Sequence, residues 1–130
     1  MVLIDLYKDK FMGINSAPQT KPRESQDEYF PIALAYLQNN ITSNLTISEV
    51  VKQTGIGKTT LENIFQKNEG MGIMAYFMQM KMDAAKEMLL RKNYSITDIA
   101  QELGFSSANN FSRTFKKHTG FSPKKYQMFF

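Results

Sequence analysis

Apolar and polar positions alternate with the period of an α-helix along most of the chain, which predicts an all-α fold of about seven helices. In residues 58–68, for example, Leu61, Ile64 and Phe65 stand three and four positions apart and so share one face. Residues 73–91 contain neither glycine nor proline and are rich in Ala, Met, Leu, Lys and Glu. All five residue types favour helix, so one long helix is expected there.

Capping signals mark the ends of the shorter helices. Thr46 is followed three residues later by Glu49, and Ser95 is followed three residues later by Asp98, as in a capping box. Helices are therefore expected to begin after residues 46 and 95, and glycines at 55, 70, 104 and 120 to interrupt or end them. A proline at 123 opens a short final helix, in which Tyr126 is the expected packing residue.

The N-terminal part follows a different pattern. Residues 1–12 have apolar positions at helical spacing, and residues 13–27 hold glycine, two prolines and several polar residues, as a linker does. An apolar helical pattern resumes over residues 28–40, with Pro31 expected in its first turn, where a missing N–H costs nothing. We therefore expect residues 1–27 to form a stub and linker, and residues 28–130 to form the main domain.

A duplication is the strongest feature of the main domain. Residues 46–68 and 95–118 repeat the same caps, inner-face positions and glycines about fifty residues apart. Each copy predicts two short helices joined by a tight turn that carries glycine, which is the helix-turn-helix signature. The expected architecture is two such units, homeodomain-like, joined by a linking helix over residues 73–91.

Composition excludes several classes of function. The 130 residues include no cysteine and one histidine, so no disulfide, thiolate metal site or cysteine nucleophile is expected. The sequence contains no evident nucleophile paired with a base, no paired carboxylates and no glycine-rich phosphate loop. We therefore expect that the protein is not an enzyme and that it binds no cofactor and no metal. The methionine-rich run at 71–82 is interrupted by a lysine and favours an ordinary core over a membrane or cofactor role. Without a bilayer-length apolar run or a signal peptide pattern, the expected location is the cytoplasm, with no membrane partner.

Charge favours an anionic partner. The net charge is +4, and residues 105–130 carry five Lys and Arg and no Asp or Glu. A solvated helix face would explain such a segment as well. The repeat decides between the two, because two helix-turn-helix units on one chain can read two segments of the DNA major groove without dimerisation.

Residues opposite the inner stripes are the candidates for contact with DNA. Arg113 can donate two bonds to guanine, asparagines can bond adenine, and Glu62 can accept from cytosine. Lysines are better suited to phosphate. The candidates are Lys58, Thr59, Thr60, Glu62 and Asn63 in the first copy, and Ser107, Asn109, Asn110, Ser112, Arg113, Lys116 and Lys124 in the second. A linking helix of 19 residues reaches about 28 Å against about 34 Å for a turn of DNA, which predicts bent DNA or strained engagement of one unit.

Two segments resemble the DNA-binding domain of the AraC/XylS family of bacterial transcription regulators: TISEVVKQTGIGKTTLENIFQKNEG and SITDIAQELGFSSANNFSRTFKKHTGFSPKKY. The resemblance covers about residues 28–128 and implies seven helices, two helix-turn-helix units and base contacts by the exposed positions. Arg113 matches the family's DNA-facing arginine, whereas Asn63 and Lys81 stand where the family often has arginine.

The resemblance also implies a transcription activator whose partners are double-stranded DNA and RNA polymerase. A small-molecule effector would act only through a separate sensing or dimerisation domain, whose tail residues 1–27 resemble. A natural single-domain regulator is the alternative. A helical protein-interaction module is the rival function, and it would explain the apolar stripes but neither the duplicated turns nor the acid-free basic segment.

Overall fold

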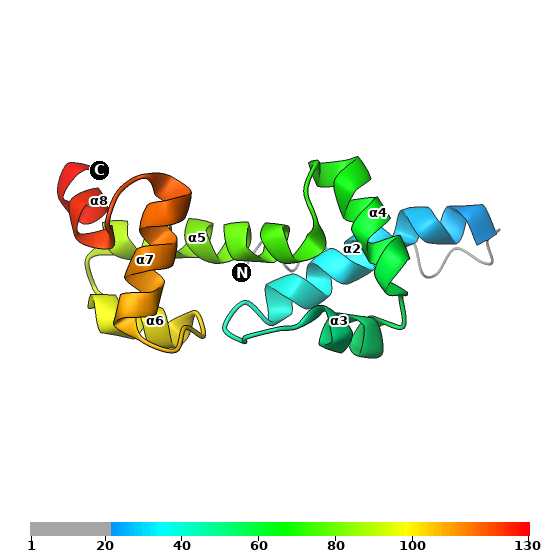
Figure 1. Ribbon diagram of the computed structural model, residues 1–130, viewed down its shortest axis with the longest axis horizontal. Helices are drawn as coiled ribbons and strands as arrows, with labels where there is room; N and C mark the ends of the chain where they lie inside the picture. The colour runs from blue at the N-terminus through cyan, green and yellow to red at the C-terminus, as the bar shows by residue number, and fades with distance from the viewer. Residues whose placement is uncertain (1–21) are drawn as a thin grey trace. The chain divides into compact units, whose positions relative to one another are not determined.

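The computed structural model describes residues 22–130, and every regular element in this part of the chain is an α-helix (Figure 1). The prediction of an all-α fold with about seven helices is confirmed. The helix expected over residues 1–12 lies outside the described residues. The helices are α2 (Pro22–Asn39), α3 (Ile47–Thr54), α4 (Lys58–Glu69), α5 (Ile73–Arg91), α6 (Ile96–Glu102), α7 (Ala108–Thr119) and α8 (Pro123–Phe129).

The start of α2 corrects the sequence prediction. The helix expected from residue 28 begins at Pro22, so residues 22–27 are helical and not linker. Pro31 accordingly lies inside the helix and not in its first turn, and it removes one backbone hydrogen bond there. The apolar face of α2 packs against α3 and α4 through the buried Ala33, Leu34 and Leu37. This tertiary packing outweighs the local cost of the proline.

The chain forms two compact units. Unit 1 contains the described residues up to Asn40 together with residues 45–76, and unit 2 contains residues 41–44 and 77–130. In unit 1, Phe65 of α4 is fully buried, and its ring lies 5.0 Å from that of Phe30 and 5.5 Å from that of Tyr76, centroid to centroid. Each unit therefore contains one helix-turn-helix: α3 and α4 in unit 1, α6 and α7 in unit 2.

Unit 2 has its own apolar core, built where α5 meets α6 and α7. The C-terminal helix α8 closes this core through Tyr126, whose ring meets Phe115 edge-on at 5.5 Å. Tyr126 is thus a packing residue of the final helix, as predicted. Gln127 adds a hydrogen bond from its side-chain amide to the Leu89 carbonyl, 3.0 Å away. The buried core residues are Met82, Ala85, Leu89, Ile99, Ala100, Leu103, Phe111 and Phe115.

Both predicted capping boxes are present. The Thr46 backbone N–H donates to the Glu49 carboxylate at 2.9 Å, and the Ser95 N–H donates to the Asp98 carboxylate at 3.1 Å. In each case the N-cap hydroxyl also accepts from the backbone N–H three residues on. The two copies therefore begin with the same local device, which fixes the entry of the chain into the first helix of each helix-turn-helix.

Candidate nucleic-acid interface

The second helix of each helix-turn-helix, α4 or α7, is the candidate recognition helix. In α4 the apolar stripe is buried as predicted, since Leu61 and Phe65 are fully buried and Ile64 is nearly so. The opposite face is polar. Lys58, Thr59 and Asn63 are exposed, whereas Thr60 and Glu62 are half-buried. The helical phase inferred from the sequence is confirmed, and it leaves three of the five candidates fully available on this helix.

Glu62 has a role that the sequence did not indicate. Its carboxylate oxygen Oε1 accepts a hydrogen bond from the backbone N–H of Ile73 at 3.2 Å, at the start of α5. The first N–H groups of a helix have no partner within the helix, and a carboxylate there also meets the positive end of the helix dipole. Glu62 therefore caps α5, with one oxygen engaged inside unit 1, and it is not the free acceptor that was expected.

In unit 2 the recognition helix α7 begins with a side-chain cap. The Ser107 hydroxyl accepts from the Asn110 N–H at 2.9 Å, and the Asn110 side-chain amide donates to the Ser106 hydroxyl at 3.0 Å. Ser107 is thereby committed to the helix start, and Asn110 is partly so. On the rest of the helix, Asn109 and Arg113 are exposed and Ser112 is half-buried.

Aromatic packing holds α7 on its unit. Phe111 and Phe115 are fully buried, as the sequence predicted, and their ring centroids lie 5.7 Å apart. Phe105 extends the row on one side, 5.3 Å from Phe111, and Tyr126 extends it on the other. Because two consecutive turns of one face are anchored in this way, the opposite face of α7 is held outward with little freedom to rotate.

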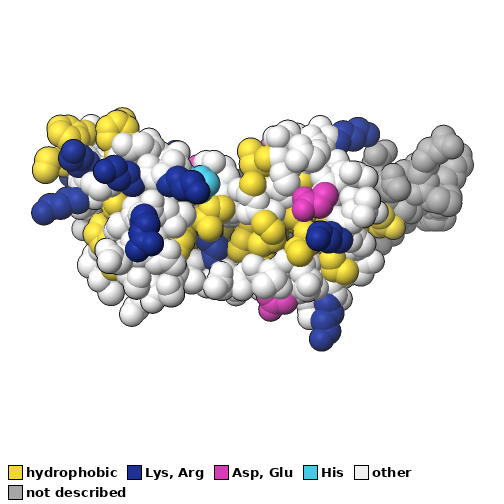
Figure 2. Space-filling model, in the orientation of Figure 1, with side chains coloured by type: hydrophobic (Ala, Val, Ile, Leu, Met, Phe, Trp, Pro, Cys, Tyr) yellow, Lys and Arg dark blue, Asp and Glu magenta, His cyan; other side chains and the backbone are white. Residues whose placement is uncertain are grey.

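Positive charge gathers over unit 2. Figure 2 shows Lys and Arg side chains over the region of α7 and α8. These helices contribute Arg113, Lys116, Lys117, Lys124 and Lys125, all of them exposed. In unit 1, α4 contributes only Lys58 and Lys67, alongside the acidic Glu62 and Glu69. The two candidate surfaces thus share a fold but differ in charge.

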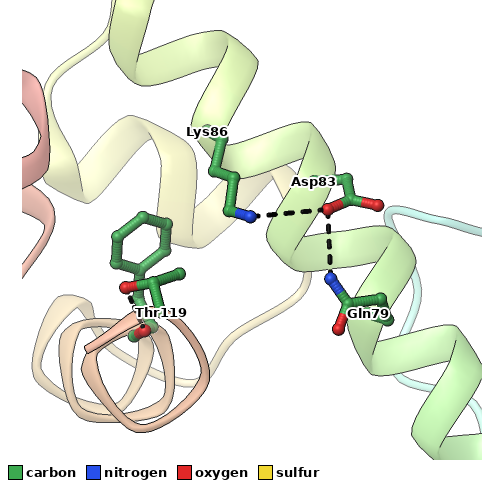
Figure 3. Close-up of polar contacts among 5 residues, drawn as sticks. Gln79, Asp83, Lys86 and Thr119 are labelled. Carbon is green, nitrogen blue, oxygen red and sulfur yellow. Dashed lines mark hydrogen bonds and ion pairs between the residues drawn. The ribbon is translucent and has the colours of Figure 1, made fainter. Parts of the chain in front are cut away.

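The long helix α5 carries polar groups of two kinds. Figure 3 shows the first kind, in which the Gln79 side-chain amide donates to Asp83 at 3.1 Å and Lys86 lies 3.8 Å from the same carboxylate. The second kind is Lys81, which is only 3% exposed. Sequence reasoning placed Lys81 on the linking helix without assigning it to the core. A signal was present, because Phe77, Lys81, Ala85 and Leu89 recur every four residues, the spacing of a buried stripe.

Comparison with known proteins agrees with this geometry. A family model described as a helix-turn-helix domain matches residues 50–128. The crystal structure of a transcriptional regulator with an AraC-type DNA-binding domain, from Chromobacterium violaceum, shares the fold with a TM-score of 0.71 at 23% identity, over 81% of this chain and 94% of that one. The chain belongs to the AraC-type helix-turn-helix family of transcription regulators.

AraC-type relatives are also found by sequence. The multiple antibiotic resistance protein MarA of Escherichia coli is 30% identical over 95 residues, which cover 73% of this chain and 75% of MarA. An uncharacterised HTH-type transcriptional regulator in the cgkA 5′ region of Pseudoalteromonas carrageenovora is 31% identical over 98 residues, or 75% of this chain and 58% of that protein. The chain spans about half the length of several of the curated relatives that it matches.

Proposed function

We propose that this chain binds double-stranded DNA in a sequence-specific manner and regulates transcription through it. One observation carries the proposal. Each unit anchors its second helix by buried apolar residues and turns the polar face of that helix, around Asn63 on α4 and Arg113 on α7, toward solvent. A helix presented in this way enters the major groove, where its polar side chains meet base edges.

Base reading is assigned first to the exposed side chains of these two faces. Arg113 has a planar fork that can donate two bonds to guanine, and Asn63 and Asn109 can pair with adenine through amide donors and acceptors. Lys116 on α7 and Lys124 on α8 are exposed and are assigned to contacts with the DNA phosphates. Ser107 and Asn110, engaged at the start of α7, are assigned to positioning and to backbone contact.

The two units are proposed to contribute unequally. Affinity that depends on salt follows the number of phosphates neutralised, and the exposed cations are concentrated on α7 and α8. Unit 2 would therefore supply most of the electrostatic affinity. Unit 1, with Glu62 half-buried beside Asn63, would act mainly through base readout.

The wider setting is part of the same proposal. Family membership supports a cytoplasmic activator of transcription that contacts RNA polymerase and has no catalytic role. An effector would act through a separate sensing domain. No helix among residues 22–130 combines the length and apolarity needed to cross a membrane.

Selection from a random pool of DNA duplexes tests the proposal. We expect the chain to enrich one sequence, and its affinity for that duplex to fall steeply between 50 and 200 mM salt, by about a thousandfold if six phosphates are contacted. Arg113→Ala should lower the affinity of the chain for the selected duplex. The control Arg91→Ala should leave that affinity unchanged, because Arg91 forms a surface ion pair with Glu87 at 2.7 Å. A chain that enriches no sequence and shows no salt-dependent affinity for DNA would favour the protein-interaction module instead.

A further inference from the structure

Lys81 is a charged side chain in the core of unit 2. Its ammonium group donates to three backbone carbonyls: Ile41 at 2.9 Å, Ser43 at 2.7 Å and Leu103 at a short distance. The aromatic rings of Phe77 and Phe105 flank it, with centroids 4.9 and 5.8 Å from Nζ. An ammonium group has three N–H donors, so three carbonyls satisfy it completely.

These contacts join three parts of unit 2 that are far apart in the sequence. Lys81 belongs to α5, and Ile41 and Ser43 belong to the segment 41–44. Leu103 is the C-cap of α6. The carbonyls at the end of a helix have no partner within it, and a cation there also meets the negative end of the helix dipole. Lys81 therefore fixes the point at which α6 ends and the turn toward α7 begins.

Gly104, directly after Leu103, shows how closely this turn is packed. Its φ is +78°, in the left-handed region that favours glycine. A Cβ at this position would lie 2.8 Å from the Thr42 carbonyl oxygen and 3.3 Å from the Lys81 Nζ. The turn thus has no room for a side chain at this position, because segment 41–44 and Lys81 both pack closely against it.

A lysine is a costly choice for this stripe. Burial lowers the pKa of Lys81 to about 8, from an ordinary value of 10.5. Among the described residues the ion pairs join Lys86 with Asp83 and Arg91 with Glu87, so no carboxylate compensates Lys81. A leucine or methionine would fill the same space without desolvating a charge. Lysine differs from these residues in donating hydrogen bonds to the turn, and these bonds point to a role in positioning the turn in addition to filling the core.

We propose that Lys81 is a positioning residue for DNA readout by α7, because it ties the α6–α7 turn and segment 41–44 to the linking helix and so sets where the recognition helix starts. The inference rests on the proposed function. The α7 N-cap, Ser107, follows Gly104 closely, so a displaced turn displaces the start of the helix and with it Asn109 and Arg113. Small displacements of positioned groups weaken directional contacts strongly. Attraction to phosphate has no such directionality and is unaffected.

The test compares four chains of the same 130 residues: the parent, Lys81→Met, Lys81→Arg and the matched control Lys86→Met on the same helix. The probes are the duplex that the parent selects from a random pool and a scrambled version of it. At pH 7 we expect Lys81→Met to lose about tenfold in discrimination between the two duplexes, the scale of one lost base contact, with unchanged affinity for the scrambled duplex. Lys86→Met and Lys81→Arg should discriminate as the parent does, since arginine keeps the charge and the donors.

A pH series supplies a readout that packing alone would not move. Neutral lysine has two N–H donors for three carbonyls, so discrimination by the parent should fall between pH 7 and pH 9, while that of Lys81→Arg stays level. Segment 41–44 has no charged side chain, and the charged groups of the surrounding helices are common to both proteins, so they cancel in the comparison. These are Asp83, Lys86, Glu87 and Arg91 on α5, Asp98 and Glu102 on α6, and Arg113, Lys116, Lys117 and His118 on α7.

The outcomes separate the inference from the proposed function. Undiminished discrimination by Lys81→Met, or parallel pH profiles for the parent and Lys81→Arg, would overturn the role of Lys81 while leaving DNA binding intact. If Lys81→Met fails to fold, the pH series on the parent and Lys81→Arg decides. A parent that selects no duplex refutes the proposed function. Amide exchange then shows whether Lys81 holds the turn: faster exchange at Gly104 and Phe105 in Lys81→Met than in Lys86→Met supports it, and equal exchange overturns it.

Discussion

The buried lysine makes the stability of unit 2 depend on pH in a direction opposite to that of its DNA readout. In the native state Lys81 loses its proton near pH 8, whereas in the unfolded chain it does so near 10.5. Between these values the unfolded chain binds more protons, so the free energy of unfolding rises with pH. Below pH 8 the lysine is charged in both states and contributes no slope. The difference between the two pKa values corresponds to about 3 kcal/mol in the limit of high pH.

Urea denaturation of the parent and of Lys81→Met, at steps from pH 7.5 to pH 9.5, measures this contribution. Methionine does not titrate, and the tyrosines and other lysines are common to both chains, so the difference between the two isolates Lys81. We expect the free energy of unfolding to rise by about 2 kcal/mol more in the parent than in the variant across this range. A difference that stays constant would show that burial does not lower the pKa. One that falls with pH would show that the three carbonyls hold the proton more strongly than burial expels it.

Substitutions at three further positions test the interface and its support. Arg113→Ala should weaken binding to the selected duplex by about 1–3 kcal/mol and relax the preference at one base position, which a repeat of the selection would reveal. Unchanged affinity and unchanged preference would show that Arg113 does not contact the groove. Phe115→Ala should cost about 3–5 kcal/mol of stability, because the ring is fully buried, and an unaltered melting temperature would contradict its role in the core. Glu62→Ala should cost about 0.5–2 kcal/mol by removing the cap on Ile73, while Glu62→Gln keeps an acceptor there and should raise affinity for scrambled duplex by reducing repulsion of phosphate. If Glu62→Ala unfolds at the same urea concentration as the parent, the carboxylate does not cap α5.

Signals that act over three or four residues were predictable from the sequence. Thr46 with Glu49, and Ser95 with Asp98, form the capping boxes that their spacing indicates. The buried phase of α4 and α7 follows from apolar positions one turn apart, because the hydrophobic effect acts on the whole stripe at once. The helix-turn-helix architecture followed from these elements and their repetition.

Features that depend on tertiary contacts were not predictable in this way. The polar residues after Pro22 are typical of a linker, yet they continue a helix whose later turns are held by packing. Glu62 and Ile73 are close only because α4 folds back on the start of α5, and no local pattern indicates that pairing. Lys81 was visible as a lysine in a buried stripe, but its three acceptors come from segments far away in the sequence. The candidate DNA contacts remain predictions from helical phase and chemistry.

Segment 41–44 has a consequence for how the chain can be divided and synthesised. It belongs to unit 2 although residues of unit 1 flank it on both sides, so no single cut separates the two units. A fragment starting at residue 77 would lack two of the three carbonyls that Lys81 requires. During synthesis on the ribosome, Ile41 emerges 40 residues before Lys81, so its carbonyl lacks this hydrogen-bond donor until the rest of unit 1 has been made. The repeated helix-turn-helix units are therefore not interchangeable modules, because the second is finished only with a piece of chain made before the first.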